Sequence, residues 1–188
     1  MIRETVNNTY PISSKSISEI EDNIELLELE KGQTFIELDK QNNKEYFILE
    51  GVCRSYLLNP EGDELTISFF TPNTVLSPHI TRMNNQKSIL NFQSLTETKL
   101  ATIDADIFRG LMSSNSEIRD FANAVLRFEL FKKIEREIGL ASHTAKNRLI
   151  NFRNIYPSLE NLVPHSSIAS YLGISNVSLS RLRKELLS

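Results

Sequence analysis

The chain has 188 residues with 24 acidic and 21 basic side chains, so it is long enough to bury a hydrophobic core and not charged enough to be a disordered polyelectrolyte. No apolar run approaches the roughly 18 residues of a membrane span, and the first residues lack the apolar stretch of a signal peptide. We therefore expect a soluble, cytoplasmic protein without a membrane partner.

The N-terminal region is predicted to begin with a short helix over residues 13–23. Ile17 and Ile20 give this segment an apolar side, and Ser13 or Ser14 can cap its first turn.

Residues 24–104 are predicted to form an antiparallel sandwich or barrel, because short apolar or alternating runs recur between turn residues. These runs are Glu25–Glu30, Thr34–Asp39, Tyr46–Glu50, Val52–Leu58, Glu64–Phe70, Leu90–Leu95 and Lys99–Asp104. The clearest hairpin joins the fourth run to the fifth, where Pro60 fixes one backbone angle and Gly62 takes a positive one. Residues 77–87 are expected to form a loop or a short helix.

Two helices are predicted after the sheet. Asp104 caps a short helix that runs through Met112. A long helix follows from about Glu117 to Ile138, and Gly139 is expected to end it. Its apolar stripe comprises Ile118, Phe121, Val125, Phe128, Phe131, Ile134 and Ile138.

The apolar stripe of the long helix has to be covered. It can pack on the chain's own β domain, or form a coiled-coil-like seam with the same helix of a second subunit. Phe121, Phe128 and Phe131 are bulky for a strict two-stranded seam. We expect both roles, with part of the stripe on the sandwich and part on the partner, and hence a homodimer.

The C-terminal region is predicted to begin with an amphipathic helix over residues 140–156. Residues 163–184 then carry the pattern of a helix-turn-helix. Ala169 is small where two helices cross, Gly173 permits the positive backbone angle of the turn, and Ser175 can cap the second helix. A helical hairpin that only packs is the alternative, but it does not explain the basic, exposed face of the second helix.

That exposed face holds the residue types that read DNA. Arg181 suits a guanine, Asn176 suits an adenine, and Ser178 suits either a base or a phosphate. The remaining candidate DNA-contacting residues, which include phosphate contacts, are Ser167, Ser175, Val177, Arg183 and Lys184.

The charge distribution agrees with this interpretation. Residues 1–138 hold 15 basic and 22 acidic groups, whereas residues 139–188 hold six basic and two acidic groups. The body of the chain is therefore acidic and its C-terminal part is basic, so a polyanion is expected to meet the C-terminal part.

Metal-binding residues are few. Cys53 is the only cysteine, which excludes an internal disulfide and a cysteine-ligated zinc or iron–sulfur site. A cupin-type metalloenzyme would gather two or three histidines and a carboxylate, but the predicted sheet region holds only His79. His143 and His165 lie far away in the sequence. We expect no metal, no cofactor and no enzymatic activity.

The layout resembles the Crp/Fnr family of bacterial regulators over residues 13–188. The most specific part is Ile168–Ser175 followed by Leu179–Lys184, and Tyr46–Gly51 and Arg54–Tyr56 are also similar to the family pattern. The resemblance implies an α+β fold: an N-terminal antiparallel β-roll of the double-stranded β-helix type, a long dimerisation helix and a C-terminal winged helix-turn-helix. The implied boundaries are 1–115, 116–139 and 140–188.

The resemblance also implies a homodimer that binds a pseudo-palindromic DNA site, with RNA polymerase as a further partner and an effector of unknown identity. Ser77 and Pro78 stand where nucleotide-binding members carry Gly-Glu, and Ser88 stands where they carry an arginine. Without that arginine a buried phosphate lacks its main partner, so we predict no cyclic AMP binding. Val177 replaces a frequently acidic residue and suits a thymine methyl group. The alternative is a ligand-sensing β-roll whose C-terminal domain no longer binds DNA.

Overall fold

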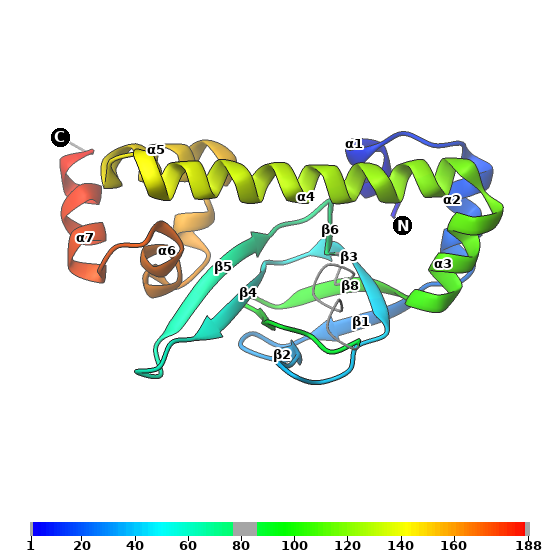
Figure 1. Cartoon of the computed structure of the whole chain (residues 1–188), viewed down its shortest axis with the longest axis horizontal. Coiled ribbons are helices and arrows are strands. Elements are labelled where there is room, and N and C mark those ends of the chain that lie inside the picture. Colours follow the sequence, from blue (N-terminus) through cyan, green and yellow to red (C-terminus); the bar gives the residue numbers. More distant parts are fainter. Residues whose placement is uncertain (1, 77–85, 187–188) are drawn as a thin grey trace.

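The computed structural model describes residues 2–76 and 86–186, which form a β-roll, a long helix above it and a group of helices at each end (Figure 1). The helices are α1 Arg3–Thr9, α2 Ser14–Glu21, α3 Ala105–Ser114, α4 Ser116–Ser142, α5 Ala145–Ile155, α6 His165–Leu172 and α7 Asn176–Glu185, with a short 3-10 turn at Leu159–Asn161. The strands are β1 Glu25–Leu29, β2 Thr34–Ile36, β3 Lys44–Glu50, β4 Cys53–Leu58, β5 Glu64–Phe70, β6 Thr74–Leu76, β7 Asn91–Ser94 and β8 Thr98–Asp104. No described helix is both long and apolar enough to cross a membrane.

The strands form two sheets in the orders β1-β8-β3-β6 and β2-β7-β4-β5, and all of the pairings between them are antiparallel. The predicted antiparallel β-roll is therefore confirmed. The β4–β5 hairpin closes as expected: Gly62 has a φ of 88°, and the amide of Asn59 donates to the carbonyl oxygen of Asp63 at 2.9 Å.

Neighbouring residues on β3 and β5 face different parts of the core, as the alternation of a strand requires. On β3, Phe47 packs against the helices, whereas Ile48 packs between the two sheets. On β5, Phe69 packs against the C-terminal helices, whereas Phe70 packs between the sheets. The roll therefore has an inner core and two outer cores, one under α4 and one under the C-terminal helices.

The long helix α4 has 27 residues and spans roughly 40 Å. The prediction that Gly139 ends it was wrong, because the helix continues to Ser142 and Gly139 is buried within it. A glycine inside a helix costs only about 1 kcal/mol. The end is instead set by extended backbone at His143 and by Thr144, whose side chain caps α5.

Other differences from the expected elements are short segments. Helix α1 and the three-residue strand β6 were not anticipated, and α3 runs two residues past Met112, to Ser114. The expected caps were confirmed at Ser13 for α2 and at Asp104 for α3. Residues 77–85, most of the expected loop, lie outside the described residues. The described residues from 143 to 186 contain no strand, so the wing of the expected helix-turn-helix is not seen among them.

Gly51, between β3 and β4, has a φ of 83°, and an added Cβ there would lie 2.8 Å from the Cα of Thr98 and closer still to the carbonyl oxygen of Glu97. We expect Gly51→Ala to lower the free energy of unfolding by about 2 kcal/mol or more, because backbone strain adds to a backbone clash. Urea unfolding followed by circular dichroism measures the change.

Gly110 in α3 is the matched control, since an added Cβ meets nothing within 4 Å and its backbone is helical. Gly110→Ala should raise the free energy of unfolding by about 0.5–1 kcal/mol. Equal stability of the two variants would contradict the role assigned to Gly51.

Candidate DNA-binding interface

The turn between α6 and α7 has the geometry that the sequence predicts. Gly173 adopts φ 66° and ψ 40°. Its amide donates to the carbonyl of Ser170 at 3.1 Å, and the amide of Ile174 donates to that of Ala169 at 3.0 Å. These two bonds form a Schellman motif, which satisfies carbonyls at the helix end. Ser175 then caps α7 by accepting from the amide of Ser178 at 3.2 Å.

The inner side of the helix-turn-helix is apolar. Ile168, Ala169 and Leu172 of α6 are buried, as is Leu179 of α7. They share one core with the α5 residues Leu149 and Phe152. The packing of these buried side chains therefore fixes the angle between α6 and α7.

The outer side of α7 forms one exposed surface. Its members line a single shallow hollow and run from the first to the last turn of the helix: Asn176, Val177, Ser180, Arg181 and Lys184. The apolar side chain of Val177 is 69% exposed, so the chain itself does not cover it. Neither Arg181 nor Lys184 forms a salt bridge with a carboxylate of the described residues.

Three of the predicted contact residues are engaged inside the chain. Ser178 is half-buried and its hydroxyl lies 3.0 Å from that of Ser175. Arg183 is half-buried, lies 3.2 Å from a carboxylate oxygen of Glu160 and contacts the ring of His165.

The phosphate contact predicted for Ser167 is contradicted in this conformation. Ser167 is only 3% exposed, because its side of α6 faces the sheet. Its hydroxyl accepts a hydrogen bond of 3.0 Å from Arg54 of β4.

Arg54 joins the roll to the helix-turn-helix. Its guanidinium is buried and donates to Gln93, Thr66 and Ser167 at 3.0–3.3 Å, and it pairs with Glu64. The amide of Thr66 donates to the hydroxyl of Ser170 at 3.1 Å, which adds a second link. Sequence reasoning missed this role, because residues 54 and 167 lie 113 positions apart and nothing local signals the contact.

An aromatic cluster covers the same junction. The ring of Phe69 on β5 lies 5.9 Å from those of Phe152 and Tyr156 and 5.2 Å from that of Tyr171. Such pairs add roughly 0.5–1.5 kcal/mol each beyond the burial of their surface. The position of the helix-turn-helix is thus set by packing on β5 as well as by its connection to α4.

The apolar stripe of α4 divides into two parts. Ile118, Phe121 and Val125 are buried by the chain itself, so they are not available to a partner in this conformation. The second part is exposed: Phe128 by 58%, Phe131 by 60% and Ile134 by 46%. Ile138, at 48%, continues this exposed surface.

Comparison with known proteins follows the same division of the chain. The sequence model of the cyclic nucleotide-binding domain family matches residues 26–115, which cover the roll and α3. No curated protein matches the sequence. FixK2 from Bradyrhizobium japonicum has a similar structure, with a TM-score of 0.76 and 17% identity over 87% of this chain and 84% of that one.

Two further solved structures cover nearly the whole chain. A Crp/Fnr-family transcriptional regulator from Eubacterium rectale gives a TM-score of 0.73 at 18% identity, over 96% of this chain and 88% of that one. The c-di-GMP-responsive global regulator CLP from Xanthomonas campestris gives 0.73 at 13% identity, over 93% and 92%. The chain has the Crp/Fnr fold. At these identities the likeness establishes the fold, so the function has to be argued from the site.

Of the residues that the sequence analysis aligns with the nucleotide-binding positions of the family, Ser77 and Pro78 lie outside the described residues. His79, the single histidine of the predicted sheet region, lies outside them as well. Ser88 is fully buried and its hydroxyl donates to the carbonyl of Leu90 at 2.6 Å.

Burial raises the pKa of the Cys53 thiol to about 12, so this thiol stays neutral and unreactive. Among the described residues no group of three or more His, Cys, Asp or Glu is arranged to hold a metal.

We expect Arg54→Ala to lower the free energy of unfolding by about 2–3 kcal/mol, because several buried hydrogen bonds to a charged group are lost at once. Glu64 is 47% exposed and can be solvated after the change, which limits the cost. Urea unfolding of the full chain measures the effect.

Arg109→Ala is the control, since Arg109 and its partner Asp106 are 61% and 66% exposed. It should change stability by no more than about 0.5 kcal/mol. A similar effect from both variants would show that Arg54 is not a structural link.

Proposed function

We propose that this chain is a DNA-binding transcription regulator of the Crp/Fnr type, which acts as a homodimer on a pseudo-palindromic site. The observation that carries the proposal is the exposed surface of α7, the second helix of a helix-turn-helix that has the expected turn, cap and core. In such motifs the N-terminal part of the second helix enters the major groove. The role is that of a regulator and not of an enzyme, and it is exercised in the cytoplasm, where chromosomal DNA lies.

The residues on this surface suit both kinds of DNA contact. Arg181 and Asn176 have the donors for base edges, and Val177 offers a methyl contact to thymine. Lys184, one helical turn beyond Ser180, suits a phosphate. Arg183 is held by Glu160 and His165, so it supports α7 in this conformation.

The exposed half of the α4 stripe supports a dimer. A surface formed by Phe128, Phe131, Ile134 and Ile138 is a contiguous apolar patch on one helix, and such patches mark interaction sites. A symmetric pairing through α4 brings two α7 helices to one face of DNA, where half-sites lie roughly 34 Å apart.

The first test selects duplexes from a random library with the purified full chain, followed by binding titrations at several salt concentrations. We expect an inverted repeat, and Arg181→Ala should weaken binding by about tenfold or more, since a bidentate pair with guanine contributes about 1–3 kcal/mol. Cyclic AMP should leave the affinity unchanged, because Ser88 stands where nucleotide-binding members carry the arginine and offers no positive charge to the phosphate. The control is Arg109→Ala, whose helix α3 lies at the opposite end of the molecule from α7 (Figure 1).

Weak, salt-insensitive binding without any enriched sequence would favour a ligand-sensing roll whose C-terminal domain no longer reads DNA. Equal affinities for Arg181→Ala and the control would contradict the assignment of α7 as the recognition helix.

The second test is the oligomeric state. Phe131→Glu should raise the dimer dissociation constant by about 100-fold or more, because a carboxylate would be buried in an apolar seam. Analytical ultracentrifugation over a range of protein concentrations measures this change. Leu58→Glu is a matched control, since Leu58 is 58% exposed at the tip of the β4–β5 hairpin. A wild-type chain that stays monomeric, or a dimer that tolerates Phe131→Glu, would contradict the proposed seam.

A further inference from the structure

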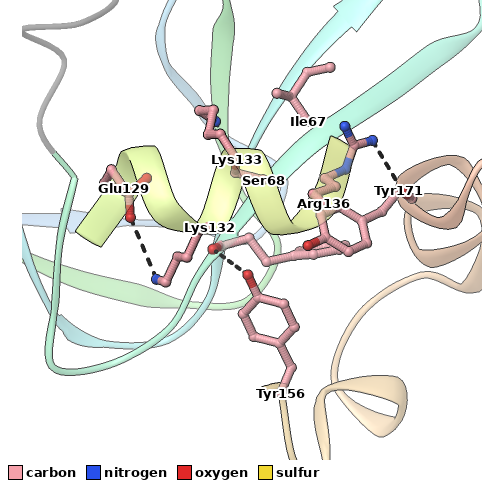
Figure 2. A pocket seen from close by; sticks show the side chains of 9 residues that line it. Ile67, Ser68, Glu129, Lys132, Lys133, Arg136, Tyr156 and Tyr171 are labelled. Carbon is pink, nitrogen blue, oxygen red and sulfur yellow. Dashed lines mark hydrogen bonds and ion pairs between the residues drawn. The ribbon is translucent and has the colours of Figure 1, made fainter. Parts of the chain in front are cut away.

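A small pocket lies where the roll, the long helix and the helix-turn-helix meet (Figure 2). Its volume is about 50 Å³. The lining residues come from β5, α4, the end of α5 and α6: Ile67, Ser68, Phe69, Glu129, Lys132, Lys133, Arg136, Tyr156 and Tyr171. It lies on the outer side of the roll, because Phe69 packs toward the C-terminal helices while Phe70 packs between the sheets.

Positive charge exceeds negative charge in this pocket. Lys132 pairs with Glu129 at 3.5 Å. Lys133 donates to the hydroxyl of Ser68 at 2.9 Å, and Arg136 donates to the backbone carbonyls of Thr66 and Tyr171 at 3.3 and 3.1 Å. Neither Lys133 nor Arg136 forms a salt bridge with a carboxylate of the described residues. Two cations therefore have only neutral hydrogen-bond partners.

Arg136 also carries an unsatisfied donor. Its Nε is buried and has no hydrogen-bond partner in the described structure, while its guanidinium lies over the ring of Tyr171 at 4.9 Å. A buried donor without a partner costs roughly 1–3 kcal/mol. Desolvation lowers the pKa of Lys133 and that of Arg136. For Lys133 the Glu129 carboxylate opposes this shift, while the neighbouring cations Arg136 and Lys132 add to it. An anion would relieve both the desolvation and the repulsion.

The size of the pocket limits the ligand. A cavity needs about 10–15 Å³ to hold one water molecule, so this one accepts a group of a few heavy atoms. We propose that the pocket binds a small anionic group, a phosphate or a carboxylate, through Lys133 and Arg136. Arginine suits both groups because its planar fork matches their oxygen atoms.

Because of its location, ligand binding at this site would influence the position of the helix-turn-helix relative to the roll. Its ligand would touch β5, α4 and α6 at once, so its binding free energy depends on how these three elements are arranged. A ligand that prefers one arrangement shifts the population toward it. The anion site itself does not depend on DNA binding and is tested without DNA.

The experiment is calorimetric titration of the full chain at low ionic strength, with inorganic phosphate in one series and acetate in another. We expect one site per chain. Lys133→Gln, which keeps a donor for Ser68, should weaken binding roughly tenfold through loss of a charge-assisted contact. Lys133→Arg should retain most of the affinity, and Lys15→Gln, an equal charge change on the exposed face of α2, should have no effect.

Binding of phosphate alone would identify a phosphoryl ligand, and binding of acetate would show that a carboxylate is accepted. Each result supports the site provided that Lys133→Gln weakens it. Absence of binding for both anions at 100-fold excess over protein, or equal affinities for Lys133→Gln and Lys15→Gln, would overturn the proposal. Circular dichroism confirms that each variant is folded.

Discussion

The contact between the first half of α4 and the outer face of the roll determines the arrangement of the rest of the molecule. The ring of Phe121 on α4 stacks on that of Phe47 on β3, with an interplanar angle of 5° and a centroid distance of 6.4 Å. Both side chains are fully buried. Because an α-helix is stiff over several turns, anchoring this half fixes the direction of the second half. The second half contacts β5 through Lys133 and Arg136, while its apolar side stays exposed. The same 27 residues therefore serve as the lid of one core and as the candidate seam of a dimer.

A second constraint acts at the far end of α4. The chain turns at His143 and returns through α5 and α6 to β5, where Phe69 and the Arg54 network hold it. α6 contributes its buried side to this contact, while α7 stands outside it with its candidate DNA-reading residues exposed. The roll thus positions α7, the proposed recognition helix, through α6. A change in the β4–β5 hairpin would reach α7 through α6 without any contact between the hairpin and DNA.

Helix caps and the turn glycine could be predicted from the sequence, since the groups that they contact lie within a few residues. Gly173, Ser175 and the caps Ser13 and Asp104 act on backbone groups nearby, and the structure has each where the pattern placed it. Each strand and each turn is also signalled by residues close together in the sequence, so the antiparallel roll could be predicted from their succession.

The failures have a shared physical cause. Gly139 interrupts the apolar pattern but not the helix, because the packing around this buried residue outweighs the small cost of a glycine inside a helix. Ser167 belongs to a helix with two covered sides, and only the fold shows that β4 and β5 cover the second one. The three-residue strand β6 is too short for its own sequence to specify, so it forms on the template of β3. The candidate anion pocket is likewise assembled from segments far apart in the chain.

In the proposed function, the exposed second half of α4 connects dimer assembly with DNA recognition. Four large apolar residues on one helix face are a poor surface for a monomer, and a symmetric partner is the simplest cover because an isologous contact pairs the same patch on both chains. Once α4 pairs, the separation of the two α7 helices depends on how each helix-turn-helix sits against its own roll. Arg54, the Phe69 cluster and the cationic pocket all act at that contact. On the proposed function, the dimer seam would set the symmetry of the DNA site, and the junction with β5 would set its spacing.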